Sequence, residues 1–184
     1  EKMKINWKEK TTINGYPADE VISSLQKDIR RGNEEDAAFW AYELSKSGKA
    51  FQSKLWERLI TIAVEDVGFG NPHVANIVQS LKQSYLSDFE NEDDRDIQAI
   101  FAATILARST KDRYIDEMKN YFKINKVKKV IPEYALDKHT KRGKALGHGS
   151  EHFWTIGAKL NPEDPKRNRK YLKEILKHHK IQDL

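Results

Sequence analysis

Apolar side chains recur at helical spacing through most of the first 125 positions. Val21, Leu25 and Ile29 follow one another at intervals of four residues, which predicts an amphipathic helix. This helix should begin at Pro17 and end at Gly32, because proline suits the first turn of a helix and glycine commonly follows the last one. Similar patterns follow along the chain, so we expect several helices that cover one another's apolar faces.

The stretch 36–72 is predicted to form the centre of the fold. It contains two helices that are joined tightly at Gly48. In the second helix Leu55, Leu59 and Ile62 lie at helical spacing, and further large apolar residues widen the stripe beyond what one surface face needs. We therefore expect this second helix to be buried in the middle of the bundle.

The ends of these helices are predicted from their residue types. Asn33 is expected to cap the first of the two helices. The central helix should stop at Gly68, because glycine readily takes up the left-handed conformation that closes a helix. Asn71 and Pro72 are then expected to open the next helix, as its N-cap and first-turn residue, and that helix should run to about Phe89.

The segment 97–106 is apolar nearly all the way round a helix. Such a helix is buried on most sides or takes part in an interface between chains. We expect a homo-oligomer that forms through this helix. The residues predicted to form the interface are Ile97, Ile100, Phe101 and Ile105.

The helical pattern breaks in the stretch 123–134, which contains four lysines and a proline. Pro132 can open a helix through about Ala145, although Gly143 and the glycines after it favour a flexible loop. The chain then closes with a basic amphipathic helix. The predicted fold is all-α, a compact helical bundle with a basic C-terminal segment. Its expected parts are an N-terminal arm (1–15), a helical core (16–125) and a basic loop and helix segment (126–184).

Composition limits the classes of protein to which the chain can belong. Over 184 residues, 38% hydrophobic and 33% charged residues are typical of a folded, highly charged chain with one core. The absence of cysteine excludes disulfides and zinc sites built from thiolates. No apolar run is long enough to span a bilayer or to serve as a signal peptide, so we predict a cytoplasmic location without membrane contact.

Charge is distributed unevenly along the chain. From Lys111 to the end there are 19 Lys and Arg against 10 Asp and Glu, whereas the first 110 residues hold 14 against 18. A basic half of this kind attracts a phosphate backbone, although solvated lysines on helix surfaces would give the same count. The residues predicted to bind DNA are Lys126, Lys128, Lys129, Lys138, Lys141, Arg142 and Lys144.

Few residue patterns point to catalysis. The chain contains no GxxxxGK[ST] loop, so we expect no nucleotide hydrolysis and no cofactor. His139, His148 and His152 are the residue types that bind metals, but no HExxH motif is present and Gly149 separates the last two, so we expect no metal site.

Glu65 and Asp66 are two adjacent carboxylates that could do acid–base chemistry. Adjacent residues on a helix point in different directions, which argues against a site that the two share. We interpret the pair as structural, with an arginine of a neighbouring helix as its partner.

Three segments resemble a known family. DAAFWAYEL (36–44), IAVEDVG (62–68) and, more loosely, HTKRGKALGHG (139–149) are similar to the C-terminal region of replication-associated recombination protein A, a bacterial AAA+ ATPase family. The resemblance covers about 16–152. It implies an all-helical oligomerisation domain similar to the collar of clamp-loader subunits, a tetramer as a plausible assembly, and action at stalled replication forks and DNA ends.

The expected function is therefore a non-catalytic oligomerisation and DNA-association module in DNA replication, recombination and repair, with replication-fork proteins as possible partners. One alternative is a metal-dependent enzyme that acts on nucleic acid or nucleotides through the histidine cluster. Another is an adaptor that binds proteins through 97–106 and does not contact DNA.

Overall fold

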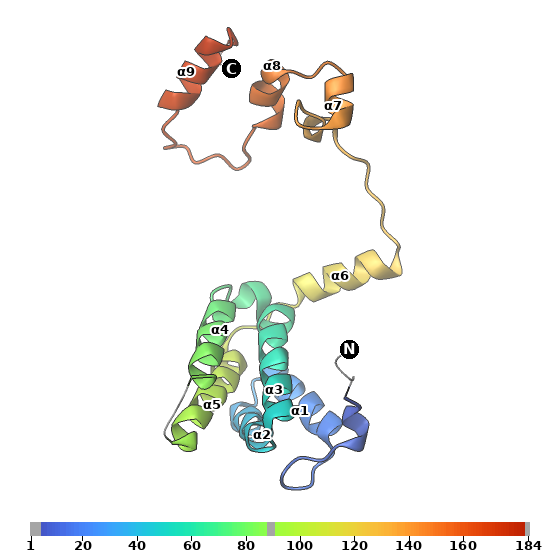
Figure 1. Ribbon diagram of the computed structural model, residues 1–184, viewed down its shortest axis with the longest axis vertical. Coiled ribbons are helices and arrows are strands. Elements are labelled where there is room, and N and C mark those ends of the chain that lie inside the picture. Colours follow the sequence, from blue (N-terminus) through green and yellow to red (C-terminus); the bar gives the residue numbers. More distant parts are fainter. Residues whose placement is uncertain (1–4, 88–90, 183–184) are drawn as a thin grey trace. The chain divides into compact units, whose positions relative to one another are not determined.

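A computed structural model describes residues 5–87 and 91–182. All the helices and strands assigned in these residues are of one kind, helices (Figure 1). The predicted all-α class is therefore confirmed. The chain divides into two compact units, Glu1–Val127, which we call the core unit, and Lys128–Leu184, which we call the basic unit. The division falls two residues after the boundary expected from the sequence. None of the described helices is long and apolar enough to cross a membrane.

The described residues of the core unit form six α-helices, of which the first five pack as a bundle while the sixth contacts the turns at 63–70. Their bounds are α1 (Ala18–Arg31), α2 (Glu34–Lys46), α3 (Lys49–Ile62), α4 (Val74–Tyr85), α5 (Glu92–Arg108) and α6 (Tyr114–Ile124). As predicted, the apolar stripe of α3 is buried, and α3 packs against α1, α2, α4 and α5. The most extensive packing between two helices, however, is that of α5 against α2, and α5 also packs against α1, α3 and α4. Alanines at positions 99, 102, 103 and 107 are buried along α5 and let its backbone approach these neighbours closely.

Several helix ends differ from the sequence-based prediction. Gly32 does close α1 in the left-handed conformation, with φ of 76°. Asn33 precedes α2 as expected, but its side chain donates a hydrogen bond to Asp28 at 3.0 Å and accepts none from the backbone of α2 among the described residues. The next helix does not begin at Asn71 and Pro72, because a 3₁₀ turn occupies Gly68–Gly70 and the side chain of Asn71 donates to Ser109 at 3.1 Å. Helix α4 begins at Val74 and ends at Tyr85, and positions 88–90 lie outside the described residues.

The last turn of α3 widens into a π-helical turn, η2 (Ala63–Val67), which the sequence pattern did not predict. A π turn holds one residue more than an α turn, so it rotates the side chains that follow relative to the α-helical register. Gly68 ends it with φ of 49°, as expected for the helix stop. A Cβ at this position would lie 2.6 Å from the carbonyl oxygen of Asp112, so both the conformation and the space favour glycine.

The N-terminal arm is part of the core unit. Trp7 packs edge-on against Phe51, with ring centroids 5.2 Å apart, and Thr12 is buried. Glu43 of α2 is buried beneath the arm and accepts hydrogen bonds from the backbone and side chain of Asn14. Ile13 of the arm is exposed.

The basic unit consists of short helical elements. They are η4 (Glu133–Ala135), α7 (Lys141–Ala145), α8 (Ser150–His152), the π turn η5 (Phe153–Gly157) and α9 (Lys170–His178). The predicted helix from Pro132 to Ala145 is wrong, because the backbone turns at Asp137 and starts a new helix at Lys141. The expected basic amphipathic helix at the C-terminal end is present as α9, with Leu176 buried.

Candidate nucleic-acid interface and self-association surface

Two local interactions stabilise helix α7: one caps its first turn, and the other packs the helix against the preceding turn. The hydroxyl of Thr140 accepts a hydrogen bond from the backbone N–H of Gly143 at 2.9 Å, which is a standard N-cap arrangement. Gly143 is buried against the preceding turn, where a Cβ would lie 1.9 Å from the carbonyl oxygen of Asp137. The stretch that we expected to be a flexible loop is therefore an ordered, tightly packed turn of helix.

This packing leaves three cations on the outer side of α7. Lys141, Arg142 and Lys144 are exposed, and none of them forms an ion pair within the part of the chain that the structure describes. Hydrated cations without acidic partners are the groups that phosphate oxygens can contact at the lowest desolvation cost.

The other four predicted DNA-binding residues are placed differently. Lys128 and Lys129 are exposed in an irregular stretch that leads to η4, and Lys126, with φ of 46°, belongs to the core unit. Lys138 is half-buried, and its ammonium group lies 5.0 Å from the centre of the Phe153 ring and 3.3 Å from the hydroxyl of Ser150. Three of the seven predicted residues therefore lie on one turn of α7, whereas Lys138 contacts other residues of the basic unit.

Aromatic side chains near α7 differ in their accessibility. Tyr134 is 63% exposed, whereas Phe153 and Trp154 are half-buried and pack on each other with ring centroids 4.9 Å apart. Phe153 also packs edge-on against His139 at 5.0 Å. An unpaired base could therefore stack on Tyr134 without any rearrangement, but not on the other two rings.

An acidic side chain organises the turn before α7. Asp137 accepts hydrogen bonds from the backbone N–H of His139 at 2.8 Å and from its ring at 3.0 Å. The hydrogen bond from the His139 side chain, followed by the one from its backbone, holds the pKa of Asp137 below its ordinary value. His139 is therefore engaged with Asp137 and Phe153.

The predicted self-association residues of α5 are unequally exposed. Ile97 is 57% exposed and Phe101 51%, whereas Ile100 and Ile105 are half-buried. Ion pairs from Arg108 to Glu34 and from Lys46 to Asp96 show that α2 runs antiparallel to α5. Exposed aromatic residues of α2, Phe39 and Tyr42, add to the apolar area that the core unit presents.

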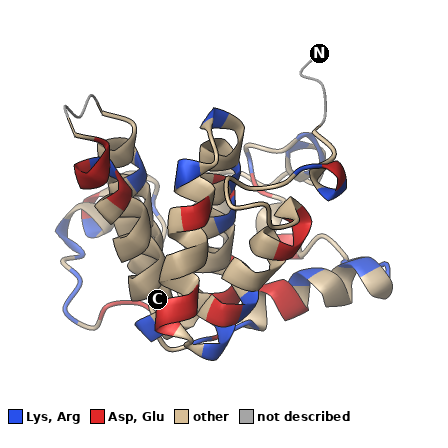
Figure 2. Ribbon diagram, turned by 90° about the horizontal axis from the view of Figure 1, so that it is seen from below, with Lys and Arg blue, Asp and Glu red and all other residues tan. Residues whose placement is uncertain are grey.

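The charges at the ends of α5 have opposite signs. Its first turn carries Glu92, Asp93 and Asp94, and its last turn carries Arg108. Figure 2 shows that acidic and basic residues are interspersed along the helices of the chain. An antiparallel pairing with a second α5 would set each acidic end near the basic end of the other helix.

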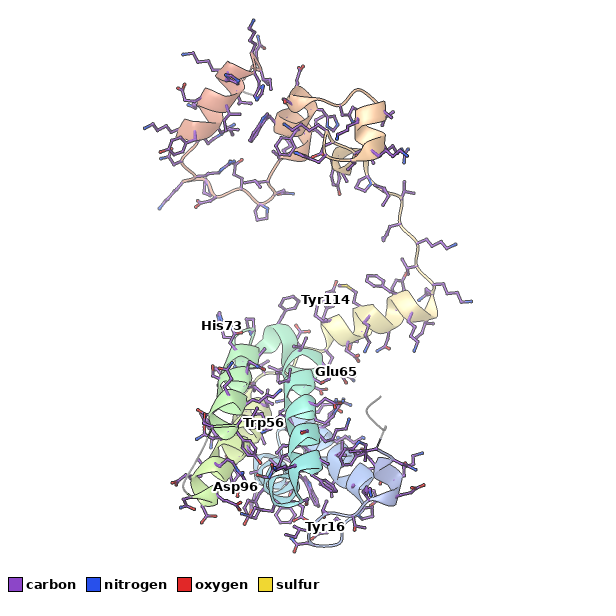
Figure 3. The ribbon with its side chains drawn as sticks, viewed as in Figure 1. Tyr16, Trp56, Glu65, His73, Asp96 and Tyr114 are labelled. Atoms are coloured by element: carbon purple, nitrogen blue, oxygen red, sulfur yellow. The ribbon has the colours of Figure 1, made fainter. Side chains whose placement is uncertain are left out.

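Glu65 and Asp66 lie at the C-terminal end of the α3 region, where Glu65 is labelled in Figure 3. Asp66 is fully buried and accepts a hydrogen bond from Arg30 at 2.6 Å, which confirms the predicted structural pairing with an arginine of another helix. The two carboxylates also share a partner, because the side-chain amide of Gln26 donates to both at 2.9 Å. The π turn rotates the side chains of Glu65 and Asp66 out of α-helical register. No local signal in the sequence predicts this π turn.

Comparison with known proteins adds no relationship: no family model matches the chain, and a search of the curated proteins finds no significant match.

Proposed function

We propose that this chain is a non-catalytic helical module that self-associates through α5 and binds the phosphate backbone of nucleic acid through the basic unit. The observation that carries the proposal is the set of three exposed cations on α7 that form no ion pair with any described residue. They belong to a unit with 14 Lys and Arg against 7 Asp and Glu. The resemblance of 36–44 and 62–68 to replication-associated recombination protein A supports a role in DNA replication, recombination and repair.

Binding of this kind is made through contacts with the phosphate backbone of the nucleic acid and not with its bases. Lysine and arginine contacts to phosphate release counterions, so affinity falls steeply as salt is added and depends little on sequence. The exposed ring of Tyr134 adds a stacking surface for unpaired bases. We therefore expect single-stranded or forked DNA to bind more tightly than a duplex.

Self-association is proposed to occur by two-fold pairing of the exposed α5 face, with Ile97 and Phe101 at its centre. A two-fold interface brings the same residues of both copies together, and apolar side chains at the centre are the usual source of its stability. The resemblance implies that such pairs assemble further into a tetramer.

The test compares two charge-reversed variants by fluorescence anisotropy on single-stranded, duplex and forked DNA. Lys141→Glu with Arg142→Glu should abolish most binding at low salt. Lys173→Glu with Lys177→Glu changes the net charge equally at exposed positions of α9, and it should bind nearly as well as the wild type. If the wild type and the α7 variant bind equally at low salt, the proposed nucleic-acid contact is wrong.

A second candidate function is a protein-binding adaptor, which the exposure of Ile97 and Phe101 favours. In that case the α5 face binds a different protein. A chain that stays monomeric at high micromolar concentration and binds no DNA would favour this function over the first.

A further inference from the structure

Three side chains with metal-binding atoms come together in the basic unit. Glu133 at the start of η4, His148 before α8 and His152 at the end of α8 each place one potential ligand atom within 4.8 Å of the others. The two histidine rings are stacked, with centroids 3.8 Å apart and planes inclined by 8°. This cluster differs from the histidine trio considered in the sequence, because the ring of His139 is bonded to Asp137 and packed on Phe153.

His148 is oriented by a backbone carbonyl. Its Nδ1 lies within hydrogen-bond distance of the carbonyl oxygen of Leu136, which can only accept, so Nδ1 carries the proton. The lone pair of a neutral ring is then on Nε2. A histidine that binds a metal through one nitrogen commonly donates its other N–H to a carbonyl or carboxylate in this way.

His152 lacks a partner for its ring nitrogens. Both of them are inaccessible to solvent and make no hydrogen bond to any described residue. A buried polar atom without a partner destabilises the folded state, so such atoms are rare and call for an explanation. A bound cation would supply the missing interaction at one nitrogen and would orient the other.

We propose that Glu133, His148 and His152 bind one Zn²⁺ ion. Two imidazole nitrogens and one carboxylate oxygen are a recurring zinc ligand set, in which water takes the fourth tetrahedral position. The stacked rings must turn about their Cβ–Cγ bonds to aim their lone pairs at one ion, because a metal lies close to the plane of each imidazole that binds it. Harder cations such as Mg²⁺ prefer oxygen ligands and should bind weakly.

The ion would connect η4 to α8 across a turn that contains α7. It requires no contact with nucleic acid, so the proposal is independent of the proposed function.

The test is isothermal titration of Zn²⁺ into the full chain after treatment with EDTA. We expect one equivalent to bind to the wild type, and at least a tenfold weaker binding to Glu133→Gln and to His152→Phe. Glu133 is exposed and Phe can preserve the ring packing of His152, so both variants should fold. The matched control is the double variant His178→Ala with His179→Ala, which removes two other histidines of the unit and should bind as the wild type does.

Cobalt provides a second measurement that needs no variant. Co²⁺ at a tetrahedral site absorbs strongly in the visible, and this absorption should develop with one equivalent of Co²⁺ and disappear when Zn²⁺ is added. The proposal is overturned if the wild type takes up no stoichiometric Zn²⁺. It is also overturned if Glu133→Gln binds normally while a control variant loses the ion.

Discussion

Replacing Asp66 by asparagine should destabilise the core unit far more than removing an exposed ion pair does. The carboxylate of Asp66 is fully buried and accepts from Arg30 at 2.6 Å and from Gln26 at 2.9 Å, and Arg113 lies 3.4 Å away. These contacts tie α1 to the π turn and to the segment before α6. Asparagine keeps the shape but removes the charge, so two cations lose their common partner.

The cost follows from the burial of the pair. Removing one member of a buried ion pair costs about 3–5 kcal/mol, because the remaining charge is left without compensation. The side chains of Arg30 and Arg113 are 29% and 36% exposed and can be partly rehydrated, and each keeps a second carboxylate, Glu65 at 3.8 Å and Asp116 at 2.6 Å. We therefore expect the lower end of this range, about 3 kcal/mol.

Urea-induced unfolding followed by circular dichroism measures this change in the free energy of unfolding. Glu34→Gln is the control, because Glu34 pairs with Arg108 across an exposed surface, where such pairs contribute about 0–1 kcal/mol. The reasoning is refuted if Asp66→Asn costs no more than Glu34→Gln.

Three further predictions follow from packing, protonation and surface exposure. Gly143→Ala should destabilise the basic unit by about 1–3 kcal/mol, because the new Cβ would overlap the carbonyl oxygen of Asp137. Gly149→Ala meets no atom within 4 Å and should be nearly neutral, and hydrogen exchange of peptides from this region compares the two. Burial alone would raise the pKa of Glu43, but hydrogen bonds from Thr12 and Asn14 outweigh it and lower the pKa below its ordinary value. The carboxylate therefore stabilises the fold above about pH 4.5 and loses this contribution as the pH falls through the lowered pKa, so Glu43→Gln should flatten the loss of stability in acid. Phe101→Glu should shift the light-scattering mass toward the monomer, whereas the exposed control Ile124→Glu on α6 should leave it unchanged.

Patterns within a few residues of sequence predicted the helices and helix ends that depend mainly on the residue types at those positions. The spacing of Val21, Leu25 and Ile29 predicted α1, and all three side chains are buried. Gly32 and Gly68 predicted helix ends because few other residues take up a left-handed conformation at low cost. These signals lie within a few residues of the feature that they determine, so they can be read without knowing the fold.

Features that depend on contacts between distant segments could not be predicted in this way. Gly143 reads as a helix breaker, yet it is required where α7 packs against the backbone of Asp137. Gln26 bonds to Glu65 across 39 positions of sequence, and no periodicity connects the two residues. Likewise, Glu133 joins the two histidines only because the turn at 136–140 reverses the chain, so the sequence suggested His139 in its place.

The central claim is that the α7 cations contact phosphate, and the salt dependence of DNA affinity tests it most directly. The measurement is the slope of log K against log salt concentration for the wild type and for Lys141→Ala with Arg142→Ala, on a single-stranded DNA. On a single strand each lost phosphate contact should reduce the slope by about 0.7, so we predict a reduction of about 1.4 for the double variant. An unchanged slope would contradict the account, because it would mean that neither side chain displaces counterions from DNA.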